Sequence, residues 1–77
     1  MTFEEFEQSY FDLISDPKVG NTYRFGQHFI NSFIKDSSTP RFQKLWNERN
    51  FKLAKFEICE YINEVHWDYN DLPLLEK

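Results

Sequence analysis

The residues best suited to recognition chemistry lie on one arc of the stretch 22–35. Read at 100° per residue, this arc carries a guanidinium, two side-chain amides, an imidazole and an ammonium group: Arg24, Gln27, His28, Asn31 and Lys35. A guanidinium donates to planar anions, amides both donate and accept, and an imidazole titrates near neutral pH. The arc therefore predicts a partner-binding strip, locally cationic on an acidic protein. The same pattern also fits a bracing role, in which Arg24 and Gln27 hold the neighbouring turns and His28 is solvated.

The opposite arc of this stretch is apolar and predicts an amphipathic helix facing the core. It carries Phe25, Phe29, Ile30 and Phe33, with Gly26 among them. Glycine inside a helix costs about 1 kcal/mol relative to alanine. We therefore expect Gly26 to let another backbone approach closely.

Local signals predict an all-α fold, a small bundle of three main helices and one short helix. The helices are expected at about 2–15, 22–35, 40–47 and 51–66, followed by an irregular tail at 67–77. Thr2 and Glu5 suit a capping box, Pro17 ends the first helix, and Asn50 suits the last N-cap. Residues 17–21 are expected to form a turn, with Gly20 at positive φ. The expected core comprises Phe3, Phe6, Tyr10, Phe25, Phe29, Phe33, Trp46, Ile58 and Ile62.

Two large apolar residues of the last helix, Leu53 and Phe56, fall outside its main apolar stripe. Both need a cover, because apolar side chains in water forgo the free energy of burial. The tail carries Trp67, Leu72 and Leu74, so the sequence predicts that it folds back over them. A second copy of the chain or a foreign partner is the alternative cover, which makes Leu53 and Phe56 candidate partner-binding residues.

Composition limits the classes of function. The sequence has 77 residues, 19% of them aromatic, and is expected to form a single helical domain over 1–77. The formal net charge of −4 disfavours nucleic acid as a partner. One cysteine, no secretory leader and no long apolar run predict a cytoplasmic protein without a membrane span.

Catalytic, metal and cofactor sites are not indicated. The two histidines, His28 and His66, belong to different expected helices, and no nucleophile, zinc or phosphate-loop motif is present. Glutamates at 57, 60 and 64 form a line typical of a solvated helix face. Cys59 has no cationic cluster that would activate its thiol. We therefore expect a protein that is not an enzyme and needs no cofactor.

Residues 24–31 match the pattern Arg-x-Gly-Gln-x-aromatic-x-Asn. Two further segments come later in the chain, Leu45-Trp46-Asn47-Glu48 and Cys59-Glu60-Tyr61-Ile62. Over residues 22–62 the chain resembles a loose group of small, largely uncharacterised proteins of bacteria, phages and other mobile elements. The resemblance implies a compact helical unit of phage or prophage origin and no activity. Small acidic phage proteins often bind a host protein and inhibit or redirect it, and by analogy this chain would do the same.

The sequence thus predicts a non-enzymatic protein-binding module, a phage- or mobile-element-encoded regulator or inhibitor of an unidentified host protein, with self-association possible. The alternative is a nucleic-acid-binding regulator that uses the Arg24, Gln27, His28 and Asn31 face, since such side chains can read base edges.

Overall fold

The first helix, α1 (Phe3–Ile14), begins with the predicted capping box. In the computed structural model, which describes residues 1–75, Glu5 N donates to Thr2 Oγ1 at 3.0 Å and Thr2 N donates to Glu5 Oε1 at 2.9 Å. These two hydrogen bonds satisfy backbone donors that the first helical turn leaves free. The helix ends with Ser15 as its C-cap, two residues before Pro17, as the sequence predicts.

The expected turn at residues 17–21 is instead a short helix, α2 (Pro17–Gly20). The Asp16 carboxylate accepts from Lys18 N at 3.0 Å, and Pro17 occupies the first helical position. The prediction of positive φ at Gly20 is wrong, since no glycine in residues 1–75 has positive φ. Gly20 instead allows a close approach, because a Cβ there would lie 2.4 Å from the Ile14 carbonyl oxygen.

Helix α3 (Phe25–Phe33) is shorter than the expected 22–35. Thr22 N and Tyr23 N both donate to the carbonyl of Val19, so these residues close α2 and cannot begin the next helix. Arg24 is therefore the N-cap. At the other end Ile34 is extended, with φ −107° and ψ 118°, so Lys35 lies beyond the helix.

The last two helices are α4 (Pro40–Asn47), with the predicted bounds, and α5 (Phe51–Glu64). Asn50 caps α5 as predicted, with Oδ1 accepting from two backbone N–H groups. The helix stops before the expected residue 66 because His66 has φ 58°. His66 N donates to Asn63 O and Trp67 N donates to Ile62 O, the pair of bonds that closes a helix around a left-handed residue.

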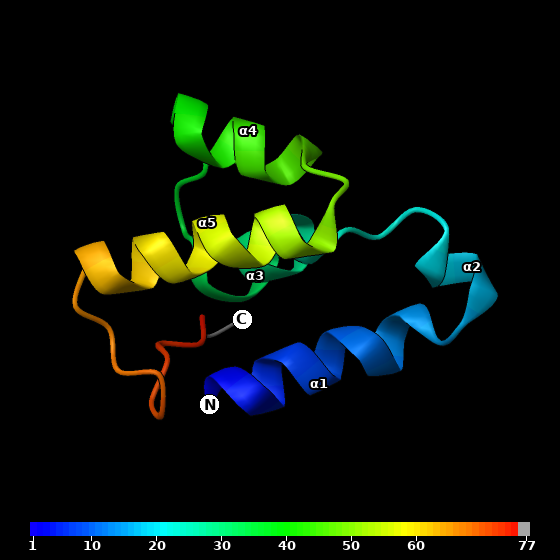
Figure 1. Ribbon diagram of the computed structural model, residues 1–77, viewed down its shortest axis with the longest axis horizontal. Helices are drawn as coiled ribbons and strands as arrows, with labels where there is room; N and C mark the ends of the chain where they lie inside the picture. The colour runs from blue at the N-terminus through cyan, green and yellow to red at the C-terminus, as the bar shows by residue number, and fades with distance from the viewer. Residues whose placement is uncertain (76–77) are drawn as a thin grey trace.

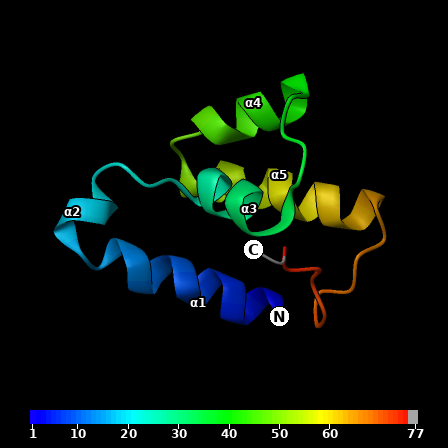
Figure 2. The same cartoon turned by 180° about the vertical axis from the view of Figure 1, so that it is seen from behind.

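Residues 1–75 form five helices and no strand element, so the all-α prediction is confirmed, with α2 the helix that the sequence did not predict. Helices α1, α4 and α5 pack against α3, and α2 packs against α1. Figure 1 shows α5 across the middle of the molecule, α4 above it and α1 below it, and Figure 2 shows α3 from behind. Phe6 of α1 stacks on Phe25 at 5.1 Å between ring centroids, and it meets Phe33 edge-on at 5.0 Å. Phe6 and Phe29 have no exposed surface.

The close approach predicted at Gly26 is confirmed. A Cβ there would lie 2.2 Å from the carbonyl oxygen of Leu45, so glycine is what lets α3 pack directly against the α4 backbone. Two of the nine expected core residues are not fully buried. Trp46 is 38% exposed because Leu45 takes the inward position on α4, and Phe3 is only partly buried.

The described part of the tail, residues 67–75, does not cover Leu53 and Phe56, so the prediction that it folds back over them is wrong. It runs along the start of α1 instead, where Phe3 N donates to Tyr69 O at 2.7 Å and Leu72 N donates to Met1 O at 2.8 Å. Leu72 is 2% exposed and belongs to the core. Free backbone donors and acceptors at the start of α1 therefore position the tail, which the helical wheel of α5 does not reveal.

Candidate interaction surfaces

The partner-binding strip predicted at residues 22–35 is not continuous in the structure. Arg24 and Gln27 are half-buried, Asn31 and Lys35 are exposed, and His28 is buried. The Gln27 side-chain oxygen accepts from Arg24 N at 3.1 Å, so this amide braces the start of α3. Arg24 faces a polar hollow of about 440 Å³ that Arg49 also lines, a neighbour that the sequence did not suggest.

His28 is 9% exposed, contrary to its expected place on the polar arc. Both ring nitrogens have partners at 2.8 Å: Nδ1 meets the hydroxyl of Tyr23, and Nε2 meets the hydroxyl of Ser9. The ring also stacks on Phe6 with 5.0 Å between centroids and 6° between planes. Burial lowers the pKa of His28 below its ordinary value. The side chain is therefore a neutral core residue with satisfied hydrogen bonds.

The hydrogen bond from Ser9 to the Phe6 carbonyl determines which atoms donate and which accept around His28. The Ser9 hydroxyl donates to the Phe6 carbonyl at 2.6 Å, and a hydroxyl has only one proton to give. Ser9 must then accept from Nε2–H of His28, which leaves Nδ1 as the acceptor for the Tyr23 hydroxyl. An imidazole that donates to Ser9 cannot also remove a proton from it. We infer that His28, Ser9 and Tyr23 form a structural hydrogen-bonded cluster. The sequence did not identify Ser9 and Tyr23 as partners of His28.

A groove of about 460 Å³ opens beside this hydrogen-bonded cluster, between α1, α3 and the tail. His28 and Asn31 contribute polar atoms, and Leu13 and Leu74 form an apolar rim that is 43% and 52% exposed. The tail forms one wall of the groove, since Leu75 N donates to Ser32 O at 2.9 Å. The groove therefore exists only because the tail docks where the sequence did not place it.

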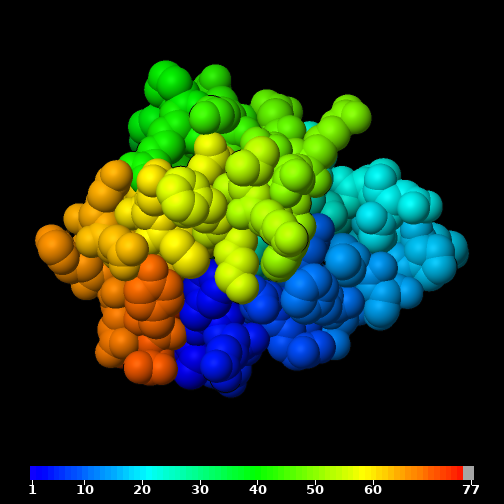
Figure 3. Space-filling view, viewed as in Figure 1, coloured from blue at the N-terminus to red at the C-terminus, as the bar shows by residue number. Residues whose placement is uncertain are grey.

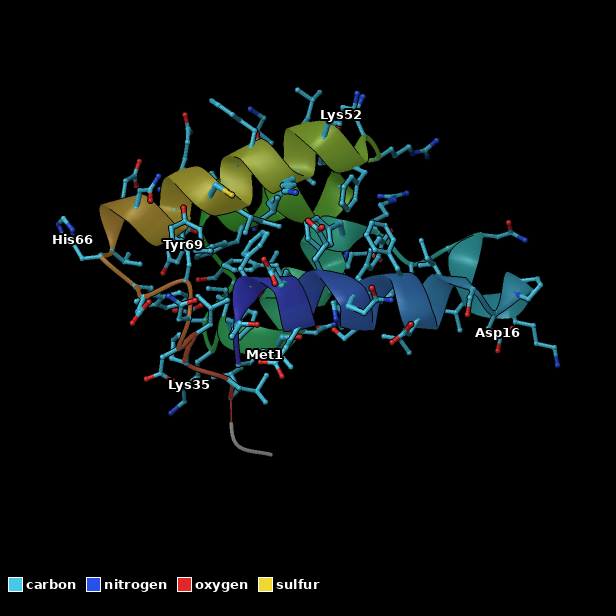
Figure 4. All side chains as sticks on the ribbon, turned by 60° about the horizontal axis from the view of Figure 1, so that its bottom comes forward. Met1, Asp16, Lys35, Lys52, His66 and Tyr69 are labelled. Carbon is cyan, nitrogen blue, oxygen red and sulfur yellow. The ribbon has the colours of Figure 1, made fainter. Side chains whose placement is uncertain are left out.

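The outer face of α5, which we define as Lys52, Leu53, Phe56 and Glu60, is the most exposed apolar helix surface that we find in residues 1–75. Leu53 is 54% exposed and Phe56 is 63% exposed. Figure 3 shows α5, in yellow, at the front of the molecule between α4, in green, and α1, in blue. Figure 4 shows Lys52 pointing away from α1. The sequence predicted that these apolar groups need a cover, and within residues 1–75 neither is covered.

The glutamates of α5 and Cys59 are the other side chains that could carry chemistry. Among residues 1–75 no group of three or more His, Cys, Asp or Glu side chains is placed to hold a metal ion. Glu57 pairs with Lys44 at 3.1 Å, and Glu64 pairs with Arg41, so two glutamates of the acidic line join α5 to α4. Burial raises the pKa of the Cys59 thiol, which reduces its thiolate fraction at neutral pH.

Comparison with known proteins gave no match to any family model, curated protein or solved structure. Among the helices of residues 1–75, none has the length and apolar character needed to cross a bilayer.

Proposed function

We propose that this chain is a non-enzymatic protein-binding module that acts through the outer face of α5. The observation that carries the proposal is the exposure of Leu53 and Phe56 on a helix whose opposite side, Ala54, Ile58 and Ile62, is buried in the core. Fully burying such a side chain is worth about 1.5–3 kcal/mol, so a complementary protein surface would gain from covering both. On the two flanks of this face, ion pairs join α5 to its neighbours: Lys55 pairs with Glu7 of α1, and Glu57 pairs with Lys44 of α4.

The biological role that we propose is regulation or inhibition of a host protein in the cytoplasm. It rests on the resemblance of residues 22–62 to small phage and mobile-element proteins and on the acidic, compact character of the chain. Interfaces of this kind need a central apolar anchor and a polar rim. Phe56 would be the anchor, and Lys52 and Glu60 would belong to the rim.

We do not extend the proposal to nucleic acid. That alternative needs Arg24, Gln27, His28 and Asn31 on one open face, and His28 lies in the core while Gln27 braces its own helix. Arg24, Asn31 and Lys35 remain available as a separate polar contact for a protein partner.

The test is retention of bacterial proteins by the tagged chain and by three variants. We expect Leu53→Asp and Phe56→Asp to lose the retained protein, because burying a charge at the centre of an apolar contact is costly. Trp46→Asp is the matched control, since Trp46 is an exposed apolar residue of α4, and it should retain the partner. Retention that survives both α5 substitutions would overturn the proposal and direct attention to Arg24, Asn31 and Lys35.

A further inference from the structure

The charged residues of α5 divide into two groups. Lys55, Glu57 and Glu64 each pair with a residue of another helix, namely Glu7, Lys44 and Arg41. Lys52 and Glu60 form no ion pair within residues 1–75, and both belong to the outer face. The two unpaired residues have opposite charge, so this face carries a cationic end and an anionic end.

These two charges are placed symmetrically about the most exposed aromatic ring. Lys52 is four residues before Phe56 and Glu60 is four residues after it, so the three form one row along the helix. With a rise of 1.5 Å per residue, each charge lies about 6 Å along the axis from Phe56. A two-fold axis through Phe56 would place the Lys52 of one chain opposite the Glu60 of the other, twice.

We propose that the outer face of α5 binds a second copy of this chain, with two antiparallel α5 helices related by a two-fold axis at Phe56. The two Phe56 rings meet at the axis, Leu53 of each chain packs beside the ring of the other, and two Lys52–Glu60 pairs close the ends. Such a contact is isologous, because the same residues contribute from both chains. Rows spaced by four residues are also the rows that interlock in the commonest helix packing.

The antiparallel direction follows from the charges. A parallel pair would place Lys52 against Lys52 and Glu60 against Glu60, and like charges across an interface disfavour it. Antiparallel helices also bring the positive end of each helix dipole beside the negative end of the other. The inference rests on one part of the proposed function, that the outer face of α5 binds protein, and it names a second copy of the chain as the occupant.

The first measurement is sedimentation equilibrium of the wild-type chain up to millimolar concentration. We expect a reversible monomer–dimer equilibrium that Phe56→Asp abolishes and that the matched control, Trp46→Asp on α4, leaves unchanged. A wild-type chain that stays monomeric at millimolar concentration overturns the inference. If that monomer still retains a bacterial protein through Phe56, the proposed function stands alone.

The second measurement is a charge exchange that tests the direction of pairing. Lys52→Glu and Glu60→Lys each place like charges opposite one another, and each should weaken the dimer by about tenfold. Circular dichroism checks that these exposed substitutions keep the fold. The double variant Lys52→Glu/Glu60→Lys should dimerise like the wild type. An equimolar mixture of the two single variants should form a mixed dimer, since both of its pairs are attractive.

Two results would contradict this arrangement while dimerisation itself persists. Single variants that dimerise as tightly as the wild type would show that Lys52 and Glu60 do not face each other. A mixture no tighter than either variant alone would show the same. A dimer that passes both tests, with no bacterial protein retained, supports the inference and removes the host-binding role.

Discussion

Helices α3 and α5 are both rich in aromatic and aliphatic residues, yet they differ in how many of their residues are buried. Six of the nine residues of α3 are buried, against three of the fourteen in α5. In α3 the polar residue His28 is buried, because Ser9 and Tyr23 form hydrogen bonds with both of its ring nitrogens. In α5 two apolar residues stay largely exposed, because no segment of residues 1–75 covers Leu53 or Phe56. Partners, rather than residue type alone, decide which side chains are buried.

The largest expected effect comes from emptying the α3 core. Phe29 has no exposed surface and contacts rings from α1, α5 and the tail, so Phe29→Ala should cost about 3–5 kcal/mol of unfolding free energy. Against a typical total of 5–15 kcal/mol, this loss would leave a small protein largely unfolded near 37 °C. Thermal unfolding followed by circular dichroism measures it. An unchanged midpoint would contradict the enclosed position of α3.

A smaller loss is expected where α3 meets α4. Alanine normally stabilises a helix by about 1 kcal/mol relative to glycine. At position 26, however, a Cβ would lie 2.2 Å from the Leu45 carbonyl oxygen, so the two helices must move apart. We expect Gly26→Ala to destabilise by about 1–3 kcal/mol in urea unfolding. Asn31→Ala, on the exposed side of the same helix, is the control and should change stability by less than about 0.5 kcal/mol. A stabilised Gly26→Ala chain would refute the close packing.

Features set by neighbouring residues were predictable from the sequence, and those set by distant contacts were not. The capping box at Thr2, the cap at Asn50 and the bounds of α4 follow from spacings of two or three residues or from Pro40. The close approach at Gly26 was predictable, because glycine is unfavourable inside a helix unless close packing requires it. The burial of His28 depends on Ser9, nineteen residues away, and a helical wheel cannot show it.

The candidate surface was predicted in part. Leu53 and Phe56 were identified because they lie off the apolar stripe, and the structure leaves them exposed. The place of the tail was missed because backbone hydrogen bonds to Met1 and Ser32 hold it, and these bonds leave no pattern in the side chains. The spacing of Lys52, Phe56 and Glu60 was visible in the sequence. That Lys52 and Glu60 are the unpaired charges of α5 within residues 1–75 depends on ion pairs with distant residues, which the sequence does not show.

Acid should weaken the structure around α3 through His28. Burial holds the folded-state pKa of His28 below the ordinary value of 6.5, so the unfolded chain takes up the proton first as pH falls. The stability due to neutral His28 is fully present above pH 6.5 and is lost as pH falls through the folded-state pKa. Urea unfolding between pH 7.5 and 5.5 should show a steeper decline for the wild type than for His28→Gln. Equal slopes would contradict a neutral, buried imidazole.

The smallest expected effect is on the outer face of α5, and concentration makes it informative. Phe56 is 63% exposed, so Phe56→Ser should change the unfolding free energy of the dilute monomer by less than about 0.5 kcal/mol. Binding that favours the folded state raises its stability as the ligand concentration rises, and here the ligand is the chain itself. The melting temperature of the wild type should therefore rise between micromolar and millimolar protein, while that of Phe56→Ser stays constant. Parallel rises in both chains would show that Phe56 does not mediate the association. A large loss of stability in the dilute variant would show that the ring packs within its own chain, and α5 would then be as enclosed as α3.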